Sequence, residues 1–529
     1  MSSDQPGSSA VIRSPFPDVV IPNLSVHDFL FADLSTEELG RKAVVAAGAD
    51  EALTYGGLLA QIDRIAGALA ARGIAPGDVV ALHSPNSPEF VALFHGILRA
   101  GGTVTTVNSL YTGEEIGRQL LGSRARLAIT VSALAETMRT GARAAGLEDV
   151  MVVDAEHGGL ADWLAEGLSA PDVSIEPATH LAVLPYSSGT TGLAKAVMLT
   201  HRNLVANVAQ VSEIITLDPD DRVAAVLPFF HIYGMTVLLN LSLYERAQLV
   251  TFPRFDLAQF LGTIERQRCT YLFVAPPIAL ALAKHPLVGE HDLSSVHTIL
   301  SGAAPLDGTL ADAVAARLGC RVVQGYGMTE MSPVSHVVPS ERDDIPRGSV
   351  GLPISNMVCR IVDLETGQDI GIPQAGMSRP GELWCKGPNV MTGYLDDDEA
   401  TRQILDDDGF LHTGDIATVD EHGAFYVIDR VKELIKYHGY QVPPAELEAL
   451  LLTHPDVQDA AVIGVRDDDG EEVPKAFVVR SDQALRADDL MAWVAARVAG
   501  YKKVRRVEFI EEVPRSTSGK ILRKELRAR

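Results

Sequence analysis

The feature that most constrains the fold is a helix pattern followed by a buried strand pattern, repeated along the chain. In residues 54–82, apolar residues at helical spacing lead through a Gly-Ile-Ala-Pro-Gly turn into a short apolar strand. Residues 90–108 and 256–277 follow the same plan. Repeated helix–strand units with continuous apolar strands are typical of α/β folds with largely parallel sheets. The sequence therefore predicts an α/β architecture.

The composition and the hydrophobic pattern of the sequence change near residue 348. From about 348 to 429, Gly, Pro and short alternating runs predict a small β subdomain. An α+β pattern follows, with an amphipathic helix predicted in DDLMAWVAARV. We expect a flexible polar leader over residues 1–15, a large N-terminal domain over 16–431 and a small C-terminal domain over 432–529.

The charge of the chain is strongly acidic, with 45 Lys and Arg against 69 Asp and Glu and a net charge of −24. Such a chain repels nucleic acid and anionic membranes at long range, so neither is an expected partner. Residues 501–529 reverse the sign, with ten Lys and Arg against four Asp and Glu. A basic segment on an acidic body indicates an anion site or a docking face, although a solvated helix surface explains the charge equally well.

Cysteine spacing and the N-terminus bear on the compartment. The four cysteines are Cys269, Cys320, Cys359 and Cys385. Their wide gaps speak against a zinc site and against a disulfide framework, and favour a reduced, cytoplasmic location. The segment MSSDQPGSSA lacks the apolar core and basic flank of a secretory signal. Polar residues and Pro228 interrupt the most apolar window, 224–243, so it predicts buried core and no stable membrane insertion.

A glycine-rich loop is the first motif that carries chemistry. Residues 185–201 read PYSSGTTGLAKAVMLTH, and hydroxyls, glycines and one ammonium fall within nine residues of it. Free backbone N–H groups and hydroxyls form a cradle suited to phosphate. The spacing differs from a Walker P-loop, and a surface turn is the alternative for this composition alone. The candidate phosphate-binding residues are Ser187, Ser188, Gly189, Thr190, Thr191 and Lys195.

Further motifs follow this loop in a recognisable order. They are LPFFHIYG (227–234), LSGAAPL (300–306), QGYGMTE (324–330), GELWCKGPNVMTGYL (381–395), HTGD (412–415), VIDRVKELIKYHGYQVPPAELE (427–448) and PRSTSGKILRKEL (514–526). Over roughly residues 50–526 the chain resembles the adenylate-forming superfamily, and it is most similar to the 4-coumarate–CoA ligases. The loop departs from the usual family pattern at Ala194 and Ala196, where Pro and Gly are common; a Cβ at residue 196 excludes backbone angles open to Gly.

The resemblance implies a two-step reaction. A carboxylate attacks the α-phosphate of Mg-ATP and expels pyrophosphate, and the thiol of coenzyme A then displaces AMP from the acyl-adenylate. Two anions meet in the first step, so positive charge must be supplied locally. Lys520, in the STSGK loop, matches the catalytic lysine of the family, and His231 matches its aromatic gate near the substrate carboxylate. By residue type alone, Lys520 would be a surface cation and His231 a core histidine.

The resemblance also implies a nucleotide site. Thr329 matches the phosphate-contacting threonine, and Glu330 the ligand of Mg²⁺, a hard cation that prefers carboxylates. A carboxylate has two oxygens for a diol, so Asp415 is expected to accept from both ribose hydroxyls. The remaining expected nucleotide contacts are Arg430, on ribose or phosphate, and Gln324, Gly325 and Tyr326, around the adenine.

For the second step, the resemblance implies a mobile C-terminal domain. Lys432 matches the hinge about which this domain rotates after adenylation, so that one cleft serves two chemistries. Lys436 and Gln441 are expected on the face that then forms the thioester. The candidate contacts to coenzyme A are Arg254, His438 and Gly439.

The acyl pocket is expected to have small, apolar walls around one tyrosine. Its predicted lining is Tyr233, Val237, Leu300, Ala303, Gly325, Gly327, Pro333 and Val334. A flat ring suits such walls, which favours cinnamate or 4-coumarate, with Tyr233 as the polar contact for a ring hydroxyl. The alternatives are a medium-chain fatty acyl-CoA synthetase on the same scaffold and a non-catalytic nucleotide-binding protein, which only the altered loop favours.

Overall fold

The helix–strand units expected from the sequence are confirmed in the computed structural model, which describes residues 11–187, 194–437, 440–467, 472–517 and 519–529. Each unit has one helix, and each of these three helices begins after a residue whose side chain accepts a hydrogen bond from the backbone N–H three positions further on. These capping residues are Thr54, Ser87 and Asp256. The units are α3 (Tyr55–Ala71) with β4 (Val79–His83), α4 (Pro88–Arg99) with β5 (Thr103–Thr106), and α10 (Leu257–Gln267) with β13 (Tyr271–Val274).

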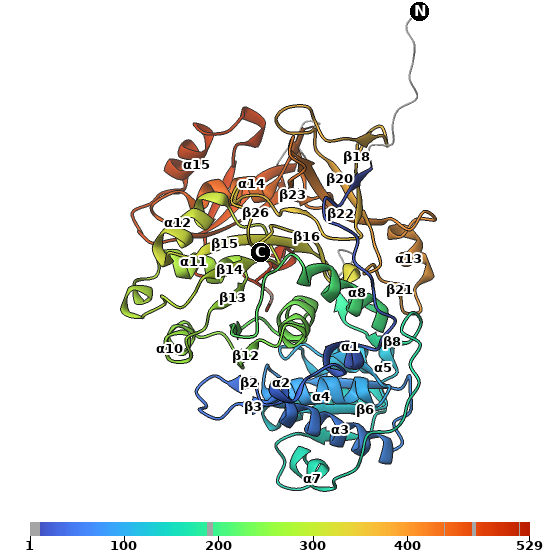
Figure 1. Ribbon diagram of the computed structural model, residues 1–529. Coiled ribbons are helices and arrows are strands. Elements are labelled where there is room, and N and C mark those ends of the chain that lie inside the picture. The colour runs from blue at the N-terminus through green and yellow to red at the C-terminus, as the bar shows by residue number, and fades with distance from the viewer. Residues whose placement is uncertain (1–10, 188–193, 438–439, 468–471, 518) are drawn as a thin grey trace, which may run out of the picture.

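Two of these units belong to an eight-stranded sheet in the lower part of Figure 1. Its central strands are parallel, whereas β10 runs antiparallel to its neighbours. In sheet order the strands are β21 (Gly393–Tyr394), β10 (Lys195–Thr200), β8 (Leu181–Val183), β5, β4, β6 (Leu127–Thr130) and β7 (Val150–Val152), with β9 (Tyr186–Ser187) paired to β10. Its further helices include α5 (Gly113–Ser123), α6 (Ala135–Ala145) and α8 (His201–Ser212).

The third unit belongs to a nine-stranded sheet with a parallel centre. In sheet order the strands are β17 (Leu352–Pro353), β16 (Val334–Val337), β15 (Arg321–Gly327), β14 (Thr298–Ser301), β13, β11 (Arg222–Ala225), β12 (Gln248–Thr251), β2 (Lys42–Ala46) and β3 (Leu53–Thr54). Helices α10, α11 (Pro276–Lys284) and α12 (Gly308–Leu318) connect its strands. These two sheets confirm the α/β class.

The expected β subdomain forms a six-stranded antiparallel sheet. Its main path is β1 (Ile12–Arg13), β18 (Val358–Val362), β20 (Gly381–Lys386), β22 (Leu411–Val419) and β23 (Phe425–Arg430), with β19 (Asp369–Ile370) at the side. Strand β1 corrects the expected leader: residues 12 and 13 pair with β18 because alternate residues there can bury Ile12 against the sheet. Residues 1–10 lie outside the described part of the chain.

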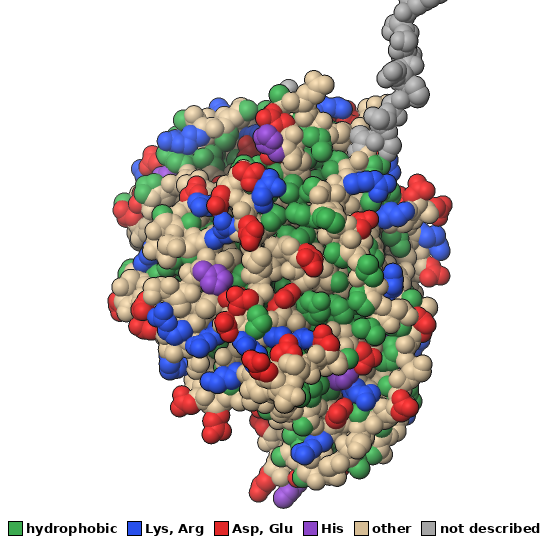
Figure 2. Space-filling view, in the orientation of Figure 1, with side chains coloured by type: hydrophobic (Ala, Val, Ile, Leu, Met, Phe, Trp, Pro, Cys, Tyr) green, Lys and Arg blue, Asp and Glu red, His purple; other side chains and the backbone are tan. Residues whose placement is uncertain are grey.

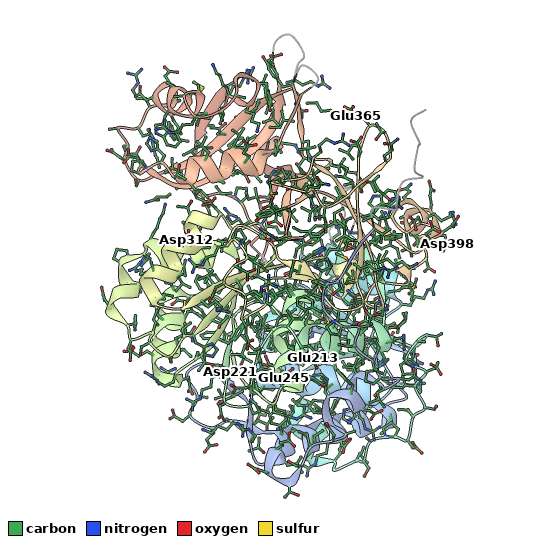
Figure 3. The ribbon with its side chains drawn as sticks, turned by 45° about the horizontal axis from the view of Figure 1, so that its top comes forward. Glu213, Asp221, Glu245, Asp312, Glu365 and Asp398 are labelled. Atoms are coloured by element: carbon green, nitrogen blue, oxygen red, sulfur yellow. The ribbon has the colours of Figure 1, made fainter. Side chains whose placement is uncertain are left out.

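The C-terminal residues build a smaller α+β lobe, set apart from the three sheets in Figure 3. Its buried apolar residues form two clusters of their own, the first of which begins at Ile435, whereas β23 ends at Arg430. The expected boundary after residue 431 falls between these two positions. The lobe contains β24 (Ile435–Tyr437), β25 (Tyr440–Val442), α14 (Pro444–Leu452), β26 (Val457–Arg466), β27 (Glu472–Arg480), α15 (Ala487–Ala495), β28 (Arg506–Phe509) and α16 (Arg523–Arg527).

The apolar window at 224–243 lies inside the large N-terminal part. It contains the π-helix η2 (Tyr233–Asn240), and residues 232–243 are buried. Among the described residues, no helix combines the length and apolar character needed to cross a bilayer. Acidic and basic side chains are interspersed over the face drawn in Figure 2, so the negative charge is not gathered into one patch on that face.

Candidate active site

A cavity lies where parallel strands β14 and β15 end, the edge at which α/β sheets bind ligands. Its volume is about 50 Å³, which is room for a few water molecules. Helix η2 and strand β16 close its other sides. All eight residues predicted for the acyl pocket line this one cavity: Tyr233, Val237, Leu300, Ala303, Gly325, Gly327, Pro333 and Val334.

Tyr233 is the polar group of the apolar wall. Its hydroxyl donates to the carbonyl of Leu300 at 3.2 Å, so the oxygen is left as an acceptor. Gly302 makes room for the ring, because a Cβ there would lie 2.9 Å from the nearest ring carbon. Burial raises the pKa of Tyr233 well above its usual value, so the hydroxyl stays protonated.

His231 is one of the polar residues that line the cavity. The backbone N–H of Tyr233 donates to Nδ1 of His231 at 3.3 Å, so the proton of the neutral ring is on Nε2. Burial, reinforced by the charge of Lys520, lowers the pKa of His231 to about 3. The ring is therefore a neutral hydrogen-bond donor at neutral pH.

Lys520 reaches the same cavity from the C-terminal lobe. Its loop closes on itself, since Ser516 Oγ accepts from the Lys520 N–H at 3.2 Å and the Ser516 N–H donates to the Lys520 carbonyl at 2.8 Å. Gly519, at φ +83°, packs against Ala275 so closely that a Cβ would lie 3.0 Å from the alanine methyl. Burial and the neighbouring Arg430 lower the pKa of Lys520, and the carboxylates of Asp415 and Glu330 oppose this shift.

Asp415 and Arg430 face each other across β22 and β23. Arg430 Nε lies 3.2 Å from Oδ1 of Asp415, and the Tyr326 hydroxyl donates to Oδ2 at 2.6 Å. Asp415 is the main reason that the pKa of Arg430 is raised. A carboxylate has about four acceptor sites, so this one keeps capacity for further donors.

Glu330 is buried beside Thr329, which lines the cavity. Oε1 of Glu330 accepts from Ser187 Oγ at 3.0 Å and from the Tyr394 hydroxyl at 2.8 Å. Both donors act on the same oxygen, and none of the described residues donates to Oε2, which can therefore serve as a ligand atom. Mg²⁺ is usually held by one or two carboxylates together with substrate phosphates, so this donor set fits that ion.

The phosphate loop is described only at its two ends. Lys195 Nζ lies 3.6 Å from a carboxylate oxygen of Asp397 and 5.1 Å from the centre of the Tyr394 ring. Ala196 lies in β10 and pairs with Tyr186, an extended conformation that any residue adopts, so its Cβ causes no strain there. The predicted residues Ser188, Gly189, Thr190 and Thr191 lie outside the described residues.

Of the three residues predicted to surround the adenine, two line the cavity and one does not. Gly325 and Tyr326 line the cavity, whereas the amide of Gln324 is hydrogen-bonded to backbone groups of Leu306 and Arg347. Gln324 thus braces the loop after β14.

Residues predicted for the second step are not gathered at this cavity. Lys436, Lys432 and Arg254 have exposed side chains, and none of the three is among the residues that line it. Gln441 pairs with Lys436 in the β24–β25 hairpin, where only its backbone is described. His438 and Gly439 lie outside the described part of the chain.

Sequence reasoning missed several residues of the site. Tyr394, which holds Glu330, is in the MTGYL motif, and its place beside another motif could have suggested a contact. No signal in the sequence pointed to Ile215, which follows α8 and reaches the cavity only through the fold. The other unpredicted lining residues are Ile232, Gly302, Met328 and Val337.

Comparisons with known proteins agree with this geometry. The family model described as AMP-binding enzyme matches residues 32–395, and the one described as AMP-binding enzyme C-terminal domain matches residues 446–520. A relative, 4-coumarate–CoA ligase 1 of Solanum tuberosum, is 41% identical over 533 residues, which cover 98% of this chain and 96% of the relative.

Solved structures show the same fold over nearly the whole chain. ATP-bound MatB from Rhodopseudomonas palustris matches with a TM-score of 0.87 at 30% identity, covering 96% of this chain and 99% of MatB. Apo MatB gives 0.77 at the same coverage, so the present arrangement is closer to the ATP-bound form. The anthranilate CoA ligase AuaEII in complex with anthranoyl-AMP matches at 0.87 and 27% identity, covering 96% of this chain and 98% of AuaEII. The chain thus belongs to the AMP-binding enzyme family, and it is an AMP-forming acid–thiol ligase.

Proposed function

We propose that this chain is an ATP-dependent acid–CoA ligase that forms an acyl-adenylate from aryl-propenoic acids such as cinnamate and 4-coumarate. The observation that carries the proposal is the mixed lining of one cavity, in which His231 and Lys520 accompany small and apolar residues. A carboxylate needs donors and positive charge, and an aryl ring needs flat apolar surroundings. The name of the Solanum tuberosum relative supports the same substrate class.

In the first step, a carboxylate oxygen of the acid bonds to the α-phosphorus of ATP, and the bond to pyrophosphate breaks. The Lys520 ammonium offsets the charge that builds up between the two anions. His231 orients the acid by donating from Nε2, while Asp415 accepts from the ribose hydroxyls. Mg²⁺ would be held by Glu330 together with the phosphates, and it would supply further charge neutralisation.

In the second step, the sulfur of coenzyme A bonds to the acyl carbon and AMP leaves. Lys520 then has no anionic pair to neutralise, and a rotation about the hinge at Lys432 withdraws it. The β24–β25 hairpin with Lys436 and Gln441 takes its place. The exposed side chain of Lys436 supports a role outside the present arrangement.

Discrimination among acids depends on Tyr233. The Tyr233 hydroxyl donates its proton to the Leu300 carbonyl, so its oxygen can accept a hydrogen bond from the ring hydroxyl of 4-coumarate. Cinnamate has no ring hydroxyl, and its binding leaves the Tyr233–Leu300 hydrogen bond in place. An apolar pocket separates such close analogues by only about 10–200-fold, so both acids are expected to react. Tyr233→Phe is expected to lower kcat/KM for 4-coumarate and to leave kcat/KM for cinnamate nearly unchanged.

The test is pyrophosphate release with ATP and a panel of acids, followed by detection of the CoA thioester. Cinnamate, 4-coumarate and caffeate are expected to have higher kcat/KM than octanoate, and a reaction without acid serves as the blank. A strong preference for octanoate would replace the substrate class by medium-chain fatty acids. No nucleotide consumption with any acid would contradict the ligase itself.

A further inference from the structure

Three soft or borderline ligand atoms meet in the interior, on side chains that do not line the acyl cavity. They belong to His336 on β16, Cys359 on β18 and Cys385 on β20, and all three residues are fully buried. Cys359 and Cys385 are directly opposite each other in the β18–β20 register. Strand β16 belongs to the nine-stranded sheet and the other two to the six-stranded sheet, so the cluster joins two sheets.

The spacing of these atoms matches the spacing of ligands around one metal ion. Cys359 Sγ lies 3.6 Å from His336 Nε2 and 3.9 Å from Cys385 Sγ, and the three ligand atoms all lie within 4.8 Å of one another. With metal–sulfur bonds of about 2.3 Å and metal–nitrogen bonds of about 2.0 Å, tetrahedral or trigonal angles give roughly 3.8–4.0 Å between sulfurs and 3.5–3.8 Å between sulfur and nitrogen.

The surroundings orient His336 as a ligand. Ser335 Oγ lies 2.9 Å from Nδ1 of His336 and 3.5 Å from the carbonyl of Tyr326, to which it donates. The hydroxyl oxygen is thereby placed to accept from Nδ1–H, which leaves the lone pair of Nε2 directed at Cys359. Metal-binding histidines typically have their second nitrogen fixed in this way.

We propose that His336, Cys359 and Cys385 bind one thiophilic d¹⁰ cation, of the kind represented by Cu⁺ and Zn²⁺. Each thiol gives up its proton as its metal–sulfur bond forms, so binding releases two protons. Soft thiolates select such ions, and no fourth Cys, His, Asp or Glu ligand joins the cluster within the described ranges. Three ligands in a dry interior suit Cu⁺ better than Zn²⁺, whose structural sites have four.

The bound ion would cross-link strands β16, β18 and β20 next to the nucleotide site. The His336 ring lies 5.9 Å from the ring of Tyr326 and 4.4 Å from that of Phe425, measured between ring centres. Coordination would fix β16 to β18 and β20 and thereby support the wall that presents Tyr326 to the cavity. None of the three ligand residues lines the acyl cavity, so the metal site does not depend on which acid the enzyme uses.

The test uses the full chain, stripped with a chelator under reducing conditions, then given one equivalent of Zn²⁺ or, without oxygen, Cu⁺. After gel filtration, about one equivalent of Cu⁺ is expected to remain, with a raised Tm, because a ligand that binds the folded state stabilises it. Cys359→Ser, Cys385→Ser and His336→Gln are expected to lose retention at least tenfold. Ser335→Ala is expected to weaken binding by about 10–100-fold.

The double variant Cys269→Ser/Cys320→Ser is the matched control, since it removes the two buried cysteines outside the cluster. Its retention is expected to equal that of the wild type. If a cluster variant fails to fold, X-ray absorption of the loaded wild type decides, with two sulfurs and one nitrogen expected around the ion. Retention of neither ion, retention that the double control abolishes, or recovery of a Cys359–Cys385 disulfide from freshly purified protein would overturn the proposal.

Discussion

The C-terminal lobe presents two cationic elements in opposite circumstances. The loop at 515–521 places Lys520 in the cavity, where burial lowers the pKa of its ammonium and the carboxylates of Asp415 and Glu330 oppose that shift. The β24–β25 hairpin leaves Lys436 in solvent. Under the proposed two-step reaction, the first element would serve adenylation and the second would be held for thioester formation in the same cleft.

The buried position of Lys520 costs free energy that the exposed position of Lys436 does not. Burying an ammonium is costly unless anions accompany it. Additional negative charge from a triphosphate and a carboxylate would favour the docked loop, and expulsion of pyrophosphate would remove part of that advantage. We therefore expect the departure of pyrophosphate to favour the exchange of the two elements.

The largest expected effect follows from removing the engaged cation. Lys520→Ala is expected to reduce carboxylate-dependent pyrophosphate exchange by about 10²–10³-fold, the range found when one preorganised donor to a developing anion is lost. Thioester formation from preformed acyl-adenylate is expected to remain close to wild type. Equal losses in both half-reactions would show that the two elements are not separate.

A change at Lys432, the proposed hinge, is expected to have the opposite pattern. Lys432→Pro fixes φ near −65° and removes a backbone N–H, which hinders rotation of the lobe. Thioester formation is expected to fall at least tenfold, with pyrophosphate exchange within about threefold of wild type. Stopped-flow measurement of both half-reactions checks this, and a greater loss in pyrophosphate exchange would contradict it.

Docking of the loop can be weakened without touching the lysine. Gly519→Ala introduces a Cβ at positive φ and against Ala275, so pyrophosphate exchange is expected to fall about tenfold through a strain of roughly 1–2 kcal/mol. Gly367→Ala is the matched control, because Gly367 has φ +69° and nothing within 4 Å of the added Cβ. Gly367→Ala is expected to leave pyrophosphate exchange unchanged, and an equal loss in both variants would show that the effect does not come from docking of the Lys520 loop.

The smallest expected effect is a difference in pH dependence. Burial lowers the pKa of Lys520, so its positive charge is lost at a lower pH than the usual lysine value of about 10.4. The rate of pyrophosphate exchange is expected to fall on the alkaline side before that pH, while thioester formation from preformed adenylate does not. Lys520→Arg, which stays charged, should remove this alkaline limb even if its activity is low. If the alkaline fall in rate persists in Lys520→Arg, a group other than Lys520 causes it.

The sequence predicted those parts of the molecule that depend on local patterns. Apolar periodicity is local, and the helix–strand units were found where they were expected. The residues expected around the acyl acid meet because the motifs come from strand ends on one edge of a sheet.

Contacts that depend on the packing of sheets could not be predicted in the same way. Glu330 is held by Ser187 and Tyr394, which come from two distant motifs. Cys359 and Cys385 are 26 positions apart in the chain, and only the antiparallel pairing of β18 and β20 brings them together with His336. Wide cysteine spacing therefore does not predict which cysteines meet inside a β-sheet.

The most direct test of the central claim is a crystal structure with a nonhydrolysable acyl-adenylate analogue. Lys520 Nζ is expected within hydrogen-bond distance of both a phosphate oxygen and the acyl oxygen, with Lys436 still in solvent. A structure in which the lysine amine lies away from the ligand, together with unimpaired pyrophosphate exchange in Lys520→Ala, would contradict the account.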